Sequence, residues 1–209
     1  MSTLEALLAE SEIEKATFTA LDAQRADLSG KELYRCTFRN VNFHEAAWRR
    51  ARLEECVFED CDLTRMQVAQ VSFLGVTFRR SKLLGVDFSE ASSNPTFTFE
   101  ACNLEYATFQ KVNLRKTYFI DCKLTESTFN ECDLVDTDFS HSELSGATID
   151  QCVLTRANFT TAGGVFIDPT RNRVKDARVG VDGAAGVAMS FGMVVAGYGT
   201  PKKARAAKR

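Results

Sequence analysis

The residues best suited to chemistry in this chain are acidic ones gathered between residues 117 and 155. This stretch holds eight acids and one base, Lys123, a balance of −7, whereas the whole chain has 26 bases, 28 acids and a net charge of −2. The eight acids are Asp121, Glu126, Glu131, Asp133, Asp136, Asp138, Glu143 and Asp150. A negative field of this kind attracts basic surfaces, including grooves built for DNA. A solvated surface that only keeps the protein in solution explains the same residues, and both interpretations stay open.

Seven cysteines raise the question of a metal site or of disulfide bonds. Three pairs are each twenty residues apart, namely Cys36 and Cys56, Cys102 and Cys122, and Cys132 and Cys152. The chain has no Cys-x-x-Cys motif and only two histidines, which argues against a zinc site. We expect buried thiols that act as small apolar residues, with no metal and no cofactor. The odd cysteine count and the lack of a recognisable secretory signal indicate a reducing cytoplasm.

Motifs for catalysis are missing from the sequence. It contains no phosphate-binding loop, no Gly-x-Ser-x-Gly motif and no cluster of metal ligands. Aspartates such as Asp133 and Asp138 could imitate an acid pair, but hydrogen bonds from turn backbone to their side chains explain them better. We therefore expect a protein that binds a partner and is not an enzyme.

The elements that position these residues follow a period of five. From Phe99 to Phe159 every fifth residue is Phe, Leu or Ile, and Phe and Leu alternate almost strictly. This period fits neither an amphipathic helix nor a flat strand. A short fixed repeat predicts a solenoid in which each unit buries its apolar side chain against its neighbours. A second inward position lies two residues earlier, and it contains all seven cysteines.

The same period runs from Phe18 to Phe88 in another phase, and eleven residues separate Phe88 from Phe99. One residue is therefore inserted between the two series, which predicts a bulge or short loop. A helix within residues 2–10, with Ser2 or Thr3 as its N-cap, is expected to cover the first coil. The expected segments are an N-terminal cap at 1–12, a first β-helix stack at 13–88, an insertion at 89–98, a second stack at 99–166, a C-terminal cap at 167–199 and a disordered basic tail at 200–209.

The repeated pattern Ala/Cys/Val, Asp/Asn, Leu/Phe, x, x resembles that of the pentapeptide-repeat proteins over roughly residues 13–166. The resemblance implies an all-β fold, a right-handed four-sided β-helix in which each side is one pentapeptide and each coil is twenty residues. The twenty-eight repeat positions then give about seven coils, stacked about 4.8 Å apart. Residues twenty apart should lie above one another, as Phe99, Phe119, Phe139 and Phe159 would.

Within this family, residues 86–93 and 99–109 look like the middle of the Qnr quinolone-resistance proteins, and the chain is also similar to MfpA-type proteins. The resemblance implies a DNA-mimicking rod that binds DNA gyrase or topoisomerase IV and protects it from a poisoning antibiotic or toxin, without binding nucleic acid directly. The acidic stretch would then replace DNA phosphates. The alternative is a non-catalytic scaffold with no topoisomerase role, since a fold does not fix a function.

The C-terminal segment is expected to close the column and to join two chains into a homodimer, as it does in members of this family. A short helix is expected at 184–190 and a short strand at 193–196. No apolar run is long enough to span a membrane. The candidate dimer-interface residues are Val187, Met189, Phe191, Met193 and Val194.

Overall fold

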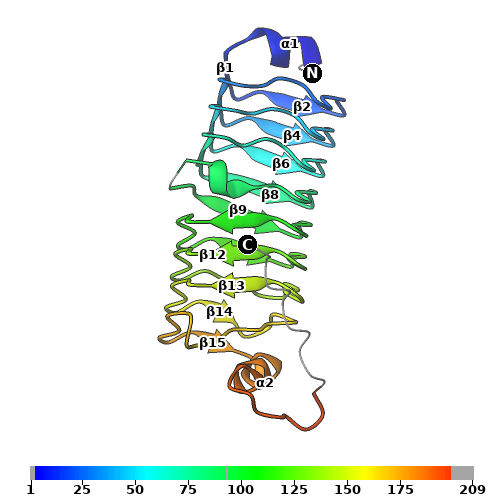
Figure 1. Ribbon diagram of the computed structural model, residues 1–209. Coiled ribbons are helices and arrows are strands. Elements are labelled where there is room, and N and C mark those ends of the chain that lie inside the picture. Colours follow the sequence, from blue (N-terminus) through cyan, green and yellow to red (C-terminus); the bar gives the residue numbers. More distant parts are fainter. Residues whose placement is uncertain (1–2, 93, 199–209) are drawn as a thin grey trace.

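The computed structural model describes residues 3–92 and 94–198. The chain winds into a tall column of about eight turns built from short parallel strands, with one helix at each end (Figure 1). The elements are α1 (Leu4–Ala9), β1 (Glu12–Glu14), β2 (Thr17–Thr19), β3 (Glu32–Tyr34), β4 (Thr37–Arg39), β5 (Arg52–Glu54), β6 (Val57–Glu59), β7 (Ser72–Leu74), β8 (Val76–Arg79), η1 (Phe88–Glu90), β9 (Phe97–Glu100), β10 (Thr108–Gln110), β11 (Tyr118–Ile120), β12 (Thr128–Asn130), β13 (Thr148–Asp150), β14 (Asn158–Phe159), β15 (Arg178–Val179) and α2 (Val181–Ser190). This confirms the predicted four-sided parallel β-helix.

Four faces run along the column, and each turn of the chain passes them in the order 1, 2, 3 and 4. Face 1 carries the sheet β2, β4, β6, β8, β9 and β11, followed by β14 and β15. Face 2 has isolated parallel bridges, such as Lys123 with Glu143. Face 3 carries β10, β12 and β13, and face 4 carries β1, β3, β5 and β7. Paired residues are twenty apart along each face, or twenty-one where a pair spans the inserted residue, so the sequence position of a residue fixes its face.

The inward residues of the five-residue period fill the column. Phe119 stacks between Phe99 and Phe139, with ring centroids 5.0 Å from each, which is close to the spacing of neighbouring strands. Two residues after each inward position, the backbone turns the corner in a left-handed conformation, as at Asp121 (φ 53°) and Glu126 (φ 56°). Such a conformation is costly for a non-glycine residue. Hydrogen bonds to the following turn stabilise it, for example Asp121 N–H to the Ser140 carbonyl at 3.0 Å.

The two stacks predicted from the sequence form one continuous column. β8 pairs directly with β9, and Phe78 faces Phe99 across this pairing. The inserted residue is absorbed between η1 and β9, where Phe97 occupies an inward position that is usually small. The Phe97 ring lies 5.0 Å from Phe73 and 5.4 Å from Phe88, so it fills the space that the irregular turn would otherwise leave empty. Because the core is continuous, the insertion does not divide the molecule.

The column is also longer than the seven predicted coils. β14 pairs with β15, and Phe159 faces Val179, which lies beyond the predicted end of the second stack at residue 166. The five-residue period is lost in this last turn, but Val165 and Ile167 are still buried there. Part of the segment predicted as a C-terminal cap therefore belongs to the β-helix.

The N-terminal helix covers the first turn, as predicted. The Thr3 hydroxyl caps α1 by accepting a hydrogen bond from Ala6 N–H at 3.2 Å, and Leu7 is buried against the core. Lys31 is buried in an inward position below the helix, and its Nζ donates to the carbonyl oxygens of Leu8 at 2.9 Å and Glu10 at 2.5 Å. A lysine in the first turn of the β-helix thus satisfies carbonyl groups at the end of α1.

The C-terminal helix α2 closes the other end and starts three residues earlier than expected. A Cβ atom at Gly186 would lie 2.6 Å from the Val165 carbonyl oxygen, so this glycine lets the helix approach the last turns of the column. The strand expected at 193–196 is not formed. The predicted disordered tail at 200–209 lies outside the described residues. Neither described helix is long and apolar enough to cross a membrane.

Candidate functional site

The eight acids singled out by the sequence are distributed around all four faces of the column. Because one pentapeptide forms one side, residues five apart lie on successive faces, as the sequence indicated. Face 1 carries Asp121 and Asp138, face 2 carries Glu126 and Glu143, face 3 carries Glu131 and Asp150, and face 4 carries Asp133 and Asp136. The eight acids therefore do not form one continuous surface.

The four acids on faces 3 and 4 are all paired with bases. The pairs are Glu131 with Lys111 at 3.7 Å, Asp133 with Arg115 at 3.1 Å, Asp136 with Arg156 at 2.6 Å, and Asp150 with Arg171. Hydrogen bonds from Arg156 and Arg171 hold the pKa values of Asp136 and Asp150 below their usual range. The four bases lie outside residues 117–155, in turns before or after the acids, so a count over that stretch alone overlooks them.

The other four acids, Asp121, Glu126, Asp138 and Glu143, make no ion pair with any residue that the structure describes. We call these four residues the acidic surface. The surrounding segments of faces 1 and 2 (98–106, 118–126 and 138–146) contain six acids and one base, a balance of −5. The corresponding segments of faces 3 and 4 (107–117, 127–137 and 147–157) contain four acids and four bases. Negative charge is thus confined to two adjacent faces.

Local hydrogen bonds orient two of these carboxylates, and a glycine leaves room for a third. Asp138 Oδ1 accepts hydrogen bonds from Ser140 N–H at 2.9 Å and from Asn158 Nδ2 at 2.8 Å, and Glu143 Oε1 accepts one from Ser145 N–H at 2.9 Å. The Glu126 carboxylate lies over Gly146, where a Cβ atom would be only 2.6 Å from Glu126 Oε1. Glycine in the next turn therefore leaves room for the Glu126 side chain.

Two exposed tyrosines lie beside the acidic surface, and the sequence analysis missed them. Tyr118 on face 1 is 50% exposed, and Tyr106 on face 2 is 62% exposed. Each precedes an acid of the surface by twenty residues, which places Tyr118 one turn before Asp138 and Tyr106 one turn before Glu126. The signal that could have found them is this twenty-residue spacing.

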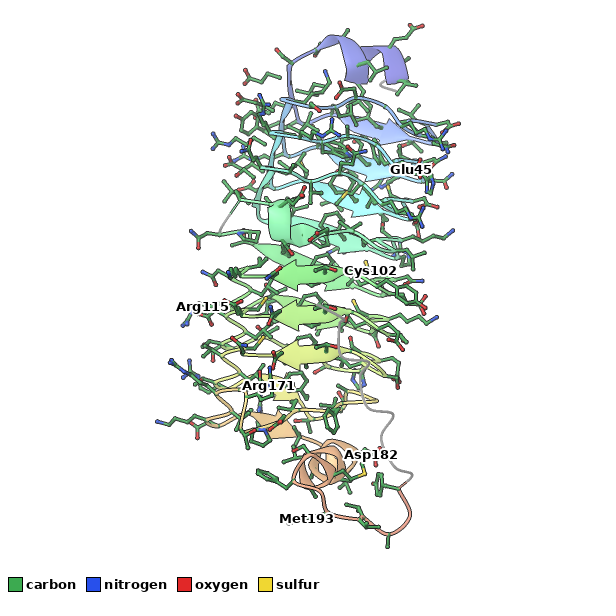
Figure 2. All side chains as sticks on the ribbon, viewed as in Figure 1. Glu45, Cys102, Arg115, Arg171, Asp182 and Met193 are labelled. Carbon is green, nitrogen blue, oxygen red and sulfur yellow. The ribbon has the colours of Figure 1, made fainter. Side chains whose placement is uncertain are left out.

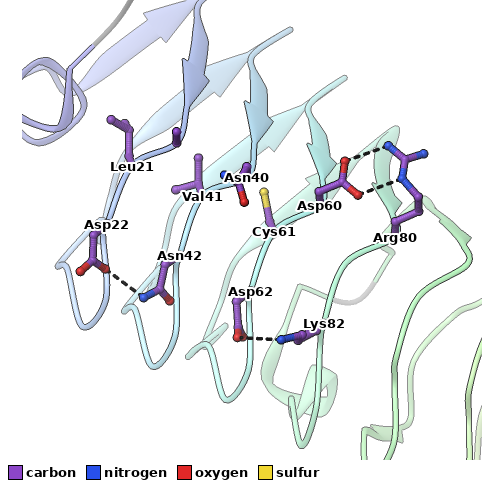
Figure 3. Close-up of a pocket in the computed structure, with 11 residues that line it drawn as sticks. Leu21, Asp22, Asn40, Val41, Asn42, Asp60, Cys61, Asp62, Arg80 and Lys82 are labelled. Atoms are coloured by element: carbon purple, nitrogen blue, oxygen red, sulfur yellow. Dashed lines mark hydrogen bonds and ion pairs between the residues drawn. The ribbon is translucent and has the colours of Figure 1, made fainter.

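The same edge in the N-terminal half of the column carries a shallow groove of about 450 Å³ (Figure 3). Its acids have polar or basic neighbours one turn away. The contacts are Asp22 with Asn42 at 2.9 Å, Asp60 with Arg80 at 2.8 Å, and Asp62 with Lys82 at 3.8 Å. Two of the three groove acids, Asp60 and Asp62, are therefore paired with bases, and Asp22 has only a neutral amide as its neighbour.

The cysteines lie in the interior. All seven are buried free thiols, and each donates to main-chain carbonyl groups, as Cys102 does to the Phe78 carbonyl at 3.3 Å. Burial raises the pKa of the Cys61 thiol to about 11, which disfavours the reactive thiolate. Within residues 3–92 and 94–198, no cluster of His, Cys, Asp and Glu side chains could hold a metal ion.

The predicted dimer-interface residues lie at the C-terminal end of the column, where Met193 projects beyond α2 (Figure 2). Phe191 is 57% exposed, Met193 62% and Val194 93%. Val187 and Met189 are half-buried, and Val187 packs against the core. The three exposed candidates therefore lie within four residues of one another, directly after the helix. Val187 instead contributes to the packing of α2 against the column.

Comparisons with known proteins agree with this architecture. The family described as the pentapeptide repeat region matches residues 31–96 and 92–162. The quinolone resistance pentapeptide repeat protein QnrB96 of Scandinavium goeteborgense is 32% identical over 114 residues, which cover 50% of this chain and 53% of that protein. The pentapeptide repeat protein QnrB4 of Escherichia coli is 31% identical over a stretch of the same length. The chain spans about half the length of the curated relatives it matches.

A solved structure extends the similarity over most of the column. Trypsin-treated QnrB1, described as a plasmid-mediated fluoroquinolone resistance protein, superposes with a TM-score of 0.52 and 26% identity, covering 88% of this chain and 89% of that one. The family match covers more than half of the sequence. The chain belongs to the pentapeptide-repeat family.

Proposed function

We propose that this protein binds a type II topoisomerase, DNA gyrase or topoisomerase IV, as a DNA mimic and protects it from a poisoning antibiotic or toxin. The observation that carries the proposal is the acidic surface, four carboxylates that no base of the described chain neutralises. The similarity to proteins named for quinolone resistance supports it, because quinolones trap these enzymes on cleaved DNA. Fluoroquinolones are accordingly the first class of poison to test.

The arrangement of charge gives the proposed complex an orientation. Duplex DNA carries one negative charge per about 1.7 Å of its axis, and a protein groove that binds it is correspondingly basic. Faces 1 and 2 offer such a groove the four carboxylates of the acidic surface, since Glu100 and Glu105 in the same segments are paired with Arg79 and Lys123. All four acids of the corresponding segments on faces 3 and 4 are paired. The column would therefore enter the groove with faces 1 and 2 inward. The same charge repels phosphates, so direct binding of nucleic acid to this surface is not part of the proposal.

Three further features complete the proposal. The protein acts by binding a partner and not by catalysis, in keeping with a sequence that has no phosphate-binding loop and no Gly-x-Ser-x-Gly motif. It acts in the cytoplasm, where a reducing environment would keep its seven thiols free. It forms a homodimer through the exposed apolar residues Phe191, Met193 and Val194 at the end of the column. Exposed apolar clusters of this kind are typical of protein interfaces.

The first experiment compares two matched triple variants in binding to purified gyrase. Asp121→Asn, Glu126→Gln and Glu143→Gln neutralise the acidic surface, and Glu131→Gln, Asp133→Asn and Asp136→Asn make the same change in charge on faces 3 and 4. We expect the first set to weaken binding about tenfold or more, since charges at an interface dominate recognition of a basic groove. The second set should bind like the parent protein. Equal effects of the two sets would reject the acidic surface as the contact.

Protection is measured separately, in a gyrase supercoiling and DNA-cleavage assay with a fluoroquinolone. We expect the parent protein to reduce the trapped cleavage complex and the first triple variant to lose this effect. Inhibition of supercoiling without a reduction of the cleavage complex would indicate mimicry without protection. No effect of the parent protein in either assay would favour the passive scaffold.

A further inference from the structure

On face 4, the column holds one of its own arginines against a tyrosine and a carboxylate. This contact indicates what a tyrosine and a carboxylate without a neighbouring arginine could bind. On face 4, Tyr34 lies one turn before Glu54, and the two residues face each other in the pairing of β3 with β5. The Arg52 guanidinium carbon lies 5.5 Å from the centre of the Tyr34 ring, and Arg52 Nη2 donates to Glu54 Oε2 at 2.9 Å. A tyrosine ring below a carboxylate thus holds one guanidinium group by stacking and by a charged hydrogen bond.

A related arrangement lies on face 1 without an arginine. Tyr118 and Asp138 precede their inward residues, whereas Tyr34 and Glu54 follow theirs. Ile120 occupies the position that corresponds to Glu32, which accepts a hydrogen bond from the Tyr34 hydroxyl at 2.5 Å. Tyr118 faces Asp138 across a parallel bridge, as Tyr34 faces Glu54. In β5, the inward residue Leu53 has Arg52 before it and Glu54 after it. The inward residue Phe139 has Asp138 before it and Ser140 after it. Ser140 takes the place of the arginine, and its side chain is too short to reach the tyrosine ring.

The groups at this second position are accessible and prearranged. Tyr118 is half exposed, and its hydroxyl makes no hydrogen bond to the described residues. Asp138 Oδ1 is held by Ser140 and Asn158, whereas Oδ2 has no hydrogen-bond partner within the part of the chain that the structure covers. A carboxylate whose orientation is fixed and whose second oxygen is free can accept a hydrogen bond from outside without losing conformational freedom.

Tyr106 and Glu126 on face 2 share the spacing but not the geometry. Tyr106 and Glu126 both lie at left-handed corners (φ 60° and 56°), and no parallel bridge among the described residues joins them, whereas one joins Tyr118 and Asp138. Tyr106 consequently offers an exposed ring without a bridged carboxylate in the next turn. It serves as an internal comparison for Tyr118, since both are exposed tyrosines beside the acidic surface.

We propose that Tyr118 and Asp138 form a binding site for an arginine side chain of the protein partner. The guanidinium group would stack on the Tyr118 ring and donate to Asp138 Oδ2, as Arg52 does at Tyr34 and Glu54. The identity of the partner rests on the proposed function. The inference adds that the basic groove of the topoisomerase contacts this part of the acidic surface through an arginine and not through a lysine. Lysine carries the same charge but has neither the planar stacking surface nor the forked donors.

The test uses fluorescein-labelled hexa-arginine and hexa-lysine peptides, with binding to the full chain measured by fluorescence anisotropy. The parent protein should bind the arginine peptide about two- to fivefold more tightly than the lysine peptide, the range expected for one exposed cation–π contact. Tyr118→Leu should remove this preference, and Tyr118→Phe should keep it. Ser140→Arg should also remove it, because the new side chain would occupy the site. Tyr106→Leu is the matched control and should leave the preference unchanged.

Two results of the peptide assay would overturn the inference: equal affinity of the parent protein for both peptides, or an arginine preference that survives Tyr118→Leu. The assay contains no topoisomerase, so its outcome is independent of the proposed function. An arginine preference in a protein that does not bind gyrase would reject only the function. Gyrase binding that depends on Asp121 and Glu126 but not on Tyr118 would reject only the arginine site.

Discussion

At the scale of single residues, position within the five-residue unit decides what an acid can do. Asp121 and Glu126 lie at left-handed corners, where side chains project outward, whereas Asp133 and Asp138 precede an inward residue and accept hydrogen bonds from the backbone two residues later. The corner acids are therefore the ones most available to a partner. Whether a base lies one turn away then determines if the charge remains unpaired.

The glycine opposite Glu126 provides a test of how that carboxylate is placed. Gly146 (φ 72°) and Gly30 (φ 70°) share the same left-handed conformation, but a Cβ atom at Gly30 would have no atom within 4 Å. Alanine at either position should cost about 1–2 kcal/mol through backbone strain. Only Gly146→Ala should also displace Glu126 and weaken gyrase binding, by up to about fivefold, as expected for one exposed ion pair. Gyrase binding and urea unfolding are measured for both variants. If both variants lose binding to a similar extent, backbone strain alone explains the loss.

At the scale of the elements, strands of two to four residues are stable only because each turn stacks on the next. Phe119 illustrates this dependence. It is fully buried, stacks on Phe99 and Phe139, and meets Phe109 and Phe129 edge to face at 5.9 Å. Its aromatic contacts therefore reach the turns before and after its own, and they join faces 1 and 3.

Removing that ring should destabilise the whole column. Phe119→Ala is expected to lower the free energy of unfolding by about 3–5 kcal/mol, the usual cost of truncating a buried aromatic residue. Thr125→Ala, at a half-exposed position on face 2 of the same turn, should change it by less than about 0.5 kcal/mol. Urea denaturation followed by circular dichroism measures both. Similar losses at the two positions would contradict the inward assignment of Phe119.

How far the sequence predicts these elements depends on the regularity of each segment. The stacking of Phe99, Phe119 and Phe139 was predicted from the five-residue period together with the four-sided coil that the resemblance to pentapeptide-repeat proteins implies. The last turn was missed because glycine and small apolar residues replace the Phe and Leu positions there, and only strand pairing with β14 reveals it. The pairing of Asp136 with Arg156 was missed although the residues are twenty apart, because the charge was counted along the chain and not between turns.

At the scale of the whole molecule, the column differs in charge from side to side and in character from end to end. Faces 1 and 2 of its second half carry the unpaired negative charge, and faces 3 and 4 carry ion pairs that join successive turns. The ends differ in character as well. Lys31 joins α1 to the first turn, whereas α2 is followed by exposed apolar residues. A rigid column with one such end can associate end to end while its sides remain free for another partner.

The proposed dimer can be tested at that end. Phe191→Asp combined with Met193→Asp should give a monomer in sedimentation velocity at concentrations where the parent protein is a dimer, because two charges would have to be buried in an apolar interface. The helix content should not change, since both residues lie beyond α2 and are exposed. Tyr106→Asp, on the side of the column, is the control and should remain dimeric. If the double variant still dimerises, the dimer contact lies elsewhere. If it is a monomer that still binds gyrase, one acidic surface is sufficient for gyrase binding.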